Sequence, residues 1–171
     1  MILFTVVSAI AGLNVGNYTF AVEDLMLNGS AYSLPLSYKK TLYFNLLAPV
    51  EVTKGCVNYN WTEILSAYTA EDMSIIDMCF PVALNGSEEI GLIQKNPRAP
   101  PTGLFVNYSV HTGSPGNLNI TMNCNRVSNM QAQEVGMVSY SVLWNHPAFC
   151  PRPVNKKSKF TNHLFNQFGM A

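Results

Sequence analysis

The chain has 171 residues, a length that fits one domain with a core of its own. Charged residues make up 12% of it, and ten Lys and Arg residues balance ten Asp and Glu residues, which gives a formal net charge of zero. A neutral chain has no field that attracts nucleic acid or an anionic membrane, so we expect neither as a partner.

Residues 1–16 begin with an apolar run, MILFTVVSAIAG, that contains the small-x-small sequence Ala9-Ile10-Ala11. Such a sequence is typical of a signal-peptidase site, but the run is short and lacks a basic N-terminal region. A signal segment and a truncated start both remain open as interpretations. The sequence holds no apolar stretch near 18 residues, so we expect no membrane span within this chain.

The first half of the chain predicts short strands at residues 18–25, 31–36 and 41–47, at a spacing typical of a β-sandwich or barrel. Residues 62–78 could form one or two helical turns, because Thr62 is a fair N-cap and apolar residues follow at helical spacing. Residues 96–102, with three prolines, predict an extended crossing loop, since proline cannot donate to a β-ladder.

The second half contains the clearest pattern, eight residues from Asn117 to Cys124 in which polar and apolar side chains alternate. This predicts a half-buried strand whose inner face carries every second residue, ending with Cys124. Residues 103–110 and 137–144 are β-branched and aromatic and predict two more strands. In the last of these, one face is predicted to carry Val138, Tyr140, Val142 and Trp144.

These elements predict an all-β domain, a flattened antiparallel β-barrel or sandwich of two packed sheets stapled by disulfides. Residues 111–116 are dense in turn residues and predict a hairpin loop. We expect the domain to span residues 17–151 and residues 152–171 to form a linker or tail.

Sequons of the form Asn-x-Ser/Thr occur six times, and none has proline in the middle. They begin at Asn17, Asn28, Asn60, Asn85, Asn107 and Asn119. This density predicts an N-glycosylated protein of the secretory pathway lumen or the extracellular space, where glycans supply solubility that charged residues usually provide.

The cysteines are an even set at wide spacing, without a C-x-x-C pair, which favours disulfides over zinc. Three connectivities are possible for Cys56, Cys79, Cys124 and Cys150. We favour the sequential pairing, Cys56 with Cys79 and Cys124 with Cys150. It closes two loops of similar length, each worth about 3 kcal/mol in the chain-entropy model.

Residues able to do chemistry are sparse. The histidines His111, His146 and His163 are far apart in predicted loops and have no metal-ligand spacing, so we expect no metal and no cofactor. The sequence contains no nucleophile elbow, phosphate loop or dinucleotide fingerprint. We therefore expect no enzymatic activity, with a secreted β-sandwich hydrolase as the alternative.

The C-terminal half combines Gly103-Leu-Phe-Val-Asn-Tyr108, the strand that ends at Cys124, and Trp144-Asn-His-Pro-Ala-Phe-Cys-Pro151. This order resembles the mannose 6-phosphate receptor homology (MRH) family, in particular the repeats of the cation-independent receptor. Its repeats have a G-L-x-x-x-Y strand, an I-x-x-x-C strand and a closing W-x-x-x-x-x-C-P. Upstream, residues 43–50 (YFNLLAPV) look like the family's Y-x-x-N-x-C-x-P strand, with Leu47 in place of the cysteine.

The resemblance implies a receptor domain that acts in cargo sorting to lysosomes through the Golgi and endosomes. Repeats of the family commonly carry eight cysteines, and the four missing here form two partner pairs, which implies the same sequential pairing for the four that remain. Sugar-binding members hold mannose with a Gln, an Arg, a Glu and a Tyr.

Tyr140 matches the Tyr of that set, and Glu134 and Gln94 are candidates for the Glu and the Gln. Phe80 stands where the family has its Gln, and the region of Gly116 and Asn117 contains no Arg. We therefore expect a repeat without mannose 6-phosphate binding, whose partner is a protein ligand or neighbouring receptor repeats. A working lectin that also binds glycans is the alternative. Plain core packing is the competing interpretation of Tyr140 and Trp144.

Overall fold

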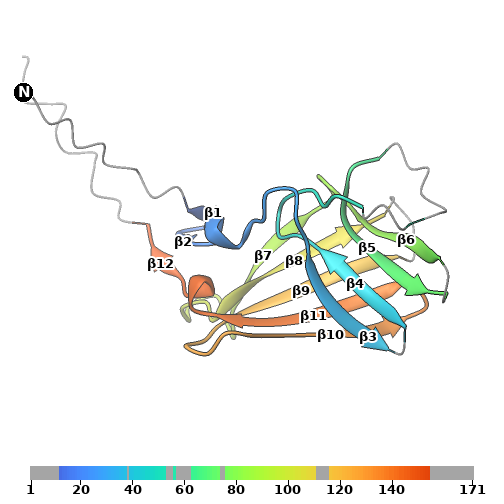
Figure 1. Cartoon of the computed structure of the whole chain (residues 1–171). Coiled ribbons are helices and arrows are strands. Elements are labelled where there is room, and N and C mark those ends of the chain that lie inside the picture. The colour runs from blue at the N-terminus through green and yellow to red at the C-terminus, as the bar shows by residue number, and fades with distance from the viewer. Residues whose placement is uncertain are drawn as a thin grey trace, which may run out of the picture.

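The computed structural model describes residues 12–37, 39–52, 56, 63–73, 76–110 and 116–154. These residues form an all-β domain of two large sheets and one small sheet (Figure 1). The four-stranded sheet has the order β3-β4-β5-β6. Its strands are β3 (Tyr32–Ser37), β4 (Lys40–Phe44), β5 (Leu65–Asp72) and β6 (Asp77–Leu84).

The second large sheet has five strands in the order β10-β11-β9-β8-β7. The strands are β7 (Glu89–Ile93), β8 (Gly103–Ser109), β9 (Asn117–Cys124), β10 (Asn129–Gly136) and β11 (Ser139–His146). After the β10–β11 hairpin, β11 lies between β10 and β9 and runs parallel to β9, with Tyr140 opposite Leu118. The sheet is therefore mixed.

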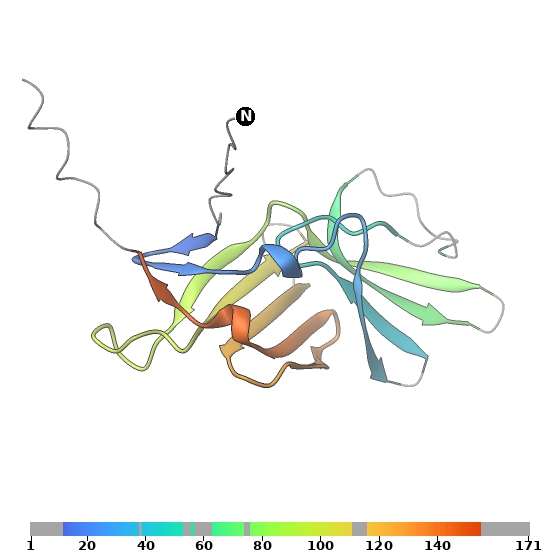
Figure 2. The same cartoon turned by 60° about the vertical axis from the view of Figure 1, so that its left-hand side comes forward.

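The small sheet joins the two ends of the described chain. It contains β1 (Leu13–Val15), β2 (Tyr18–Phe20) and β12 (Arg152–Pro153). Figures 1 and 2 show it at one end of the sandwich, away from the β5–β6 hairpin. Both β1 and β12 lie outside the range of residues 17–151 expected for the domain, because pairing with β2 organises residues on either side of that range.

The predicted sandwich of two packed sheets is confirmed, and the sheets do not close into a barrel. One core fills the space between them and draws on nearly every strand. Its fully buried members include Leu42 and Phe44 of the four-stranded sheet and Val106, Ile120 and Val142 of the five-stranded sheet. The alternation along strands such as β4 and β9 thus places one face of each large sheet in the core.

Strand β9 has the predicted bounds, and Leu118, Ile120 and Met122 are fully buried as predicted. The prediction was wrong for Cys124, which is exposed because it is the last residue of the strand. Val138 is also 40% exposed, since it belongs to the β10–β11 turn and not to β11. Tyr140, Val142 and Trp144 are buried on one face, as predicted.

The suggested helical turns within residues 62–78 are wrong. From Leu65 the segment forms β5, paired with β4 on one side and β6 on the other. All residues from Leu65 to Ala70 are buried, because this central strand has apolar contacts on both of its faces. Pairing on both sides thus overrides the helical spacing.

Two more expectations need correction. The strand expected at residues 18–25 is limited to β2, and Glu23–Leu25 forms a short 3₁₀ helix, η1. The proline segment at residues 96–102 is not an extended crossing but part of the loop of the β7–β8 hairpin. There the Asn96 side chain accepts hydrogen bonds from the backbone N–H groups of Arg98 and Ala99 and so closes a turn.

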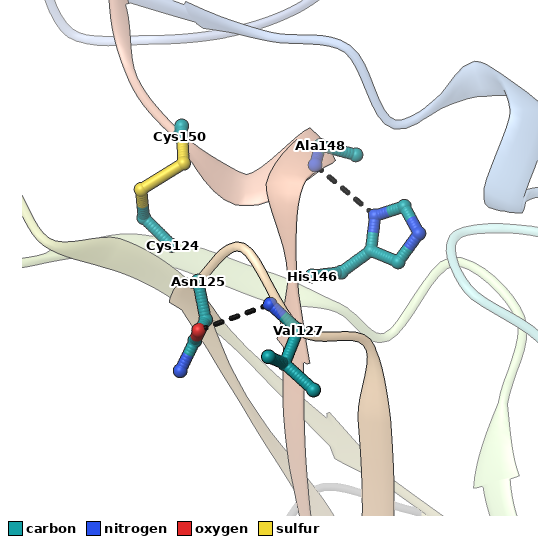
Figure 3. Close-up of a disulfide and its surroundings, with 6 residues drawn as sticks. All are labelled: Cys124, Asn125, Val127, His146, Ala148 and Cys150. Atoms are coloured by element: carbon teal, nitrogen blue, oxygen red, sulfur yellow. Dashed lines mark hydrogen bonds between the residues drawn. A yellow bond between two sulfur atoms is a disulfide. The ribbon is translucent and has the colours of Figure 1, made fainter.

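Both predicted disulfides are present, Cys56–Cys79 and Cys124–Cys150. The second joins the end of β9 to the residue that follows a 3₁₀ helix, η2 (Pro147–Phe149), as Figure 3 shows. His146 lies before η2 and its Nδ1 atom accepts a hydrogen bond from the N–H of Ala148 at 3.0 Å. This end of the five-stranded sheet is therefore fixed both covalently and by a helix cap.

Candidate binding site

Glu134 and Tyr140, two of the three predicted sugar-binding residues, are brought together. They are opposite each other in the β10–β11 hairpin. Tyr140 is 2% exposed and contributes to the core, while the Glu134 side chain is 34% exposed at the margin of the sandwich. They share a face because directly opposed residues of an antiparallel pair point to the same side of the sheet.

Gln94, the third predicted residue, lies elsewhere. It directly follows β7, where Ile93 is opposite Gly103 at the start of β8, and its amide donates to the backbone oxygen of Ala99. The register puts Gly103 beside Asn123, whereas Tyr140 is beside Leu118. Gln94 therefore lies toward the opposite end of the sheet and cannot share one sugar pocket with Tyr140.

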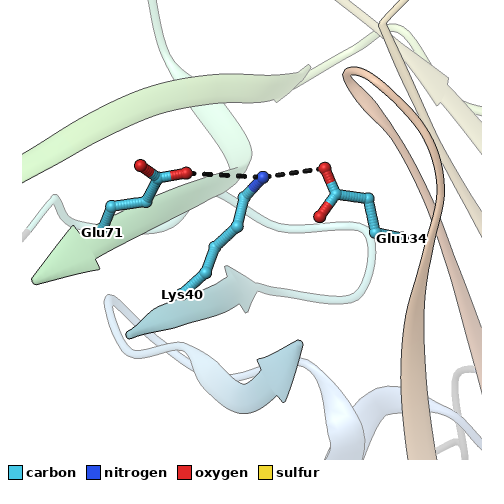
Figure 4. A network of polar contacts seen from close by, with 3 residues as sticks. All are labelled: Lys40, Glu71 and Glu134. Carbon is cyan, nitrogen blue, oxygen red and sulfur yellow. Dashed lines mark hydrogen bonds and ion pairs between the residues drawn. The ribbon is translucent and has the colours of Figure 1, made fainter. Parts of the chain in front are cut away.

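A lysine occupies the position between the two predicted residues. The Lys40 ammonium group donates a hydrogen bond to Glu134 Oε1 at 2.9 Å and lies 5.3 Å from the centre of the Tyr140 ring. Its distance to Glu71 Oε1 is 3.6 Å, so that the cation lies between two carboxylates (Figure 4). We refer to Lys40, Glu71, Glu134 and Tyr140 as the Lys40 cluster.

The local sequence explains why Lys40 points inward. Lys40 opens β4 and shares its face with the fully buried Leu42 and Phe44, because side chains two apart in a strand point the same way. Lys40 is directly opposite Glu71 on β5, and β10 faces β3 across the end of the sandwich. The Lys40 cluster thus lies between the core and the solvent and forms an ion-pair network between the two large sheets.

The environment keeps Lys40 charged. Burial lowers the pKa of its ammonium group, but hydrogen bonds and charge attraction from Glu134 and Tyr140 outweigh that effect, so the net pKa is raised above its ordinary value. The Lys40 side chain is 14% exposed, which limits the screening of its ion pairs by water. The carboxylate of Glu134 therefore already has a cationic partner at physiological pH.

An open cavity of about 380 Å³ lies over the Lys40 cluster. Its lining residues are Ser37, Lys39, Lys40, Glu71, Asp72, Met73 and Glu134. Two of these are cationic and three are anionic, which gives a local charge of −1. A phosphate group entering it would meet net repulsion.

Sequence reasoning missed Lys40 because its partner Glu134 is 94 residues away. A local signal was nevertheless present, since a charge at the start of an alternating strand shares the face of Leu42 and Phe44. Such a residue must find a counter-charge or reach the surface.

Residues of the two motifs that resemble the MRH family contact each other in the structure. Asn45 is fully buried, and its amide bonds the backbone of Leu27, Leu46 and Pro49. Two residues later, the N–H of Leu47 donates to the hydroxyl of the buried Tyr108 at 2.9 Å. The upstream and downstream motifs are thus joined by hydrogen bonds, and both have structural roles.

Trp144, also part of the quoted motif, is 2% exposed and makes edge-to-face contacts with Phe44 and Phe149. Core packing is therefore the correct interpretation of Trp144. Tyr140 packs in the core as well and additionally contacts Lys40. Phe80, which stands where the family has its Gln, is 41% exposed on β6.

The described sequons lie at two kinds of place. Asn17, Asn28 and Asn85 are exposed in turns or loops, whereas Asn107 and Asn119 are half-buried on β8 and β9. The sixth, Asn60, lies outside the described residues. His111 and His163 also lie outside them.

Within the described residues, no three His, Cys, Asp or Glu side chains gather as they would around a metal ion. The same residues contain no helix with the length and apolar character needed to cross a bilayer. In comparisons with known proteins, no family model and no curated sequence matches this chain.

Proposed function

We propose that this chain is a non-catalytic binding repeat of a lumenal or extracellular receptor of the MRH type, acting in cargo sorting to lysosomes without binding mannose 6-phosphate itself. The observation that carries the second part is the position of Lys40. Its ammonium group pairs with the carboxylate of Glu134 and lies against the ring of Tyr140. These are the two residues that would bind a sugar. A sugar hydroxyl would have to displace an ion pair to reach Glu134.

The fold and the cysteines support the family. The two packed sheets and both disulfides are those that the resemblance implies. Asn45 and Tyr108, which belong to the two motifs, form hydrogen bonds with the segment around Leu47, where the family has a cysteine. The hydrogen bond to Tyr108 thus holds in place a segment that a disulfide holds in the family.

The two disulfides are consistent with a protein outside the reducing cytosol. The exposed sequons at Asn17, Asn28 and Asn85 support the secretory pathway, with Golgi, endosome and lysosome as the proposed compartments.

A protein partner is supported by exposed apolar side chains near the cavity. Met73 lines the cavity and is 58% exposed, and Val135 and Met137, which closely follow the lining residue Glu134, are 56% and 92% exposed. Exposed Met and Val side chains around a polar centre are typical of a protein interface. We propose that a protein ligand or a neighbouring repeat contacts this end of the sandwich.

The lectin alternative has one observation in its favour. Glu134 and Tyr140 are immediate neighbours beside a cavity large enough for a monosaccharide. A ligand that displaced Lys40 could use both.

An array of phosphorylated and plain high-mannose glycans tests the proposal on the oxidised, glycosylated domain. We expect neither the wild type nor a Tyr140→Phe variant to bind any glycan on the array. Binding by the wild type that the variant loses would establish the lectin and overturn the proposal. Binding of neighbouring receptor repeats to a domain that binds no glycan would support the proposed partner.

A further inference from the structure

Asn107 and Asn119 are directly opposite each other on neighbouring strands β8 and β9. Val106 and Tyr108 point into the core from β8, as do Leu118 and Ile120 from β9. The two asparagines therefore share the outer face of the five-stranded sheet.

The hydroxyl-bearing residues of the two sequons lie on this face as well. Ser109 is two residues after Asn107, and Thr121 is two residues after Asn119. The Thr121 hydroxyl donates to Asn119 Oδ1 at 3.2 Å, and Asn119 Nδ2 donates to Asn107 Oδ1 at 2.5 Å. The side chains of Thr121, Asn119 and Asn107 thus form one continuous hydrogen-bonded group.

We propose that Asn107 and Asn119 form a paired modification site that carries one N-glycan, and not two, in the folded protein. Opposed side chains in a sheet have Cβ atoms about 4.5–5.5 Å apart. The first sugar on each amide, with its acetamido group, would need the same space above β8 and β9. Two glycans would therefore collide, so doubly modified chains pair the two strands poorly.

The chemical step requires a lipid diphosphate-linked oligosaccharide as co-substrate. A bond forms between Nδ2 of one asparagine and C1 of the first sugar, while the bond between C1 and the diphosphate oxygen breaks. The amide loses one of its two protons to a base, and the lipid diphosphate leaves. The modified amide keeps one N–H group and its oxygen, so it can still pair with the unmodified partner.

The surface around the pair suits a sugar. Phe105 is two residues before Asn107 on the same face, and its ring covers Gly91, where an added Cβ would lie 2.3 Å from the ring. On the other side, Ser141 is opposite Asn119 and helps line an open cavity of about 150 Å³. The other lining residues, Gln131, Ala132, Gln133 and Leu143, are uncharged. A sugar can pack against a flat aromatic ring and form hydrogen bonds with neutral amides.

This inference rests on the proposed passage through the secretory pathway. It also has a consequence for binding, since a glycan here covers the outer face of the five-stranded sheet. Partners of the domain are then restricted to its other surfaces, among them the end that holds the Lys40 cluster.

Peptide mapping of the folded, secreted protein tests the inference. After the disulfides are reduced and alkylated, trypsin releases residues 99–126, between Arg98 and Arg126, which contain both paired sequons and no other. Glycan removal by a peptide N-glycosidase in heavy-oxygen water then converts each occupied asparagine into labelled aspartate. We expect one label in this peptide and not two.

Two variants remove one sequon each without changing either asparagine. Ser109→Ala should leave the single label on Asn119, and Thr121→Val should leave it on Asn107. Two labels in most wild-type peptides would overturn the inference, as would a variant whose peptide carries no label. Failure of the secretory premise looks different, because labels would then be absent from the peptides of Asn17, Asn28 and Asn85 too.

Discussion

At the scale of single residues, Lys40 has the largest influence on the candidate site. Its cation separates Glu71 and Glu134, whose carboxylates would otherwise face each other across the end of the sandwich. Removing one member of a poorly solvated ion pair costs more than the pair itself contributes, because the remaining charges lose their partner. The Lys40 side chain is 14% exposed, so water screens its ion pairs only in part.

We predict that Lys40→Met lowers the free energy of unfolding by about 1–2 kcal/mol, although Met fills a similar volume. Urea unfolding followed by tryptophan fluorescence measures the loss. Lys39→Met is the matched control, since the neighbouring Lys39 is exposed in the β3–β4 turn and should change stability less. Equal effects of the two substitutions would show that the Lys40 cluster contributes no stability.

The raised pKa of Lys40 predicts the pH dependence of that loss. A group whose pKa is higher in the folded state stabilises the fold fully below its unfolded pKa, here 10.5. The stabilisation then declines as the pH rises through the folded value. The stability difference between wild type and Lys40→Met should therefore be constant between pH 7 and about 10 and shrink above it. A difference that shrinks below pH 9 would contradict this assignment.

Tyr108 provides a second test at this scale. Its buried hydroxyl accepts from the N–H of Leu47, and burial raises the pKa of the phenol. Tyr108→Phe preserves the ring but leaves a backbone donor unpaired, so we predict a loss of about 1–2 kcal/mol. Thermal unfolding measures it, with Tyr18→Phe as the control on the peripheral strand β2. An unchanged melting temperature would show that water replaces the hydroxyl at no cost.

At the scale of elements, the sequence predicted a strand correctly where polar and apolar residues alternate along it. Strand β9 has an unbroken alternation and was predicted with its bounds. Strand β5 was misread as helical because apolar residues follow Thr62 at helical spacing. In the structure Leu65, Ser66 and Ala67 are all buried, and continuous burial has no period of two. Whether such a run is a helix or a central strand depends on neighbours that are distant in sequence.

Strand β10 was missed although it carries half of the candidate site. Most of its outer residues are polar, and its inner residues Met130 and Ala132 are only partly buried, so the segment reads as a loop. The sequence did identify Glu134 and Tyr140, and the structure shows that they are neighbours. It did not identify Lys40, whose contact with Glu134 joins two different sheets.

The disulfide between Cys124 and Cys150 connects elements that already lie side by side, as His146 is opposite Cys124 in the β9–β11 pairing. We predict that the double substitution of these cysteines by serine costs about 3 kcal/mol, chiefly because the unfolded chain gains freedom. Chemical denaturation measures the cost, and the same change at Cys56 and Cys79 should cost a similar amount, since the loops span 26 and 23 residues. A loss below 1 kcal/mol for either pair would contradict the entropic account.

At the scale of the whole molecule, the domain presents three kinds of surface. One end holds the small sheet, the opposite end holds the Lys40 cluster with exposed apolar residues beside it, and the outer face of the five-stranded sheet carries the paired sequons. A receptor repeat of the kind we propose would use separate faces for its ligand and for its neighbours. We propose that the ligand contacts the end of the Lys40 cluster.

An NMR titration of the isotope-labelled, oxidised domain with mannose 6-phosphate, followed at the backbone amides of Glu134 and Tyr140, tests whether the ion pair of Lys40 prevents sugar binding. Lys40 already pairs with Glu134, and the cavity has a net charge of −1, so we predict no saturable shift of either signal up to millimolar sugar. Shifts that saturate at these two residues and vanish in Tyr140→Phe would show that the sugar displaces Lys40. That result would make this domain a lectin.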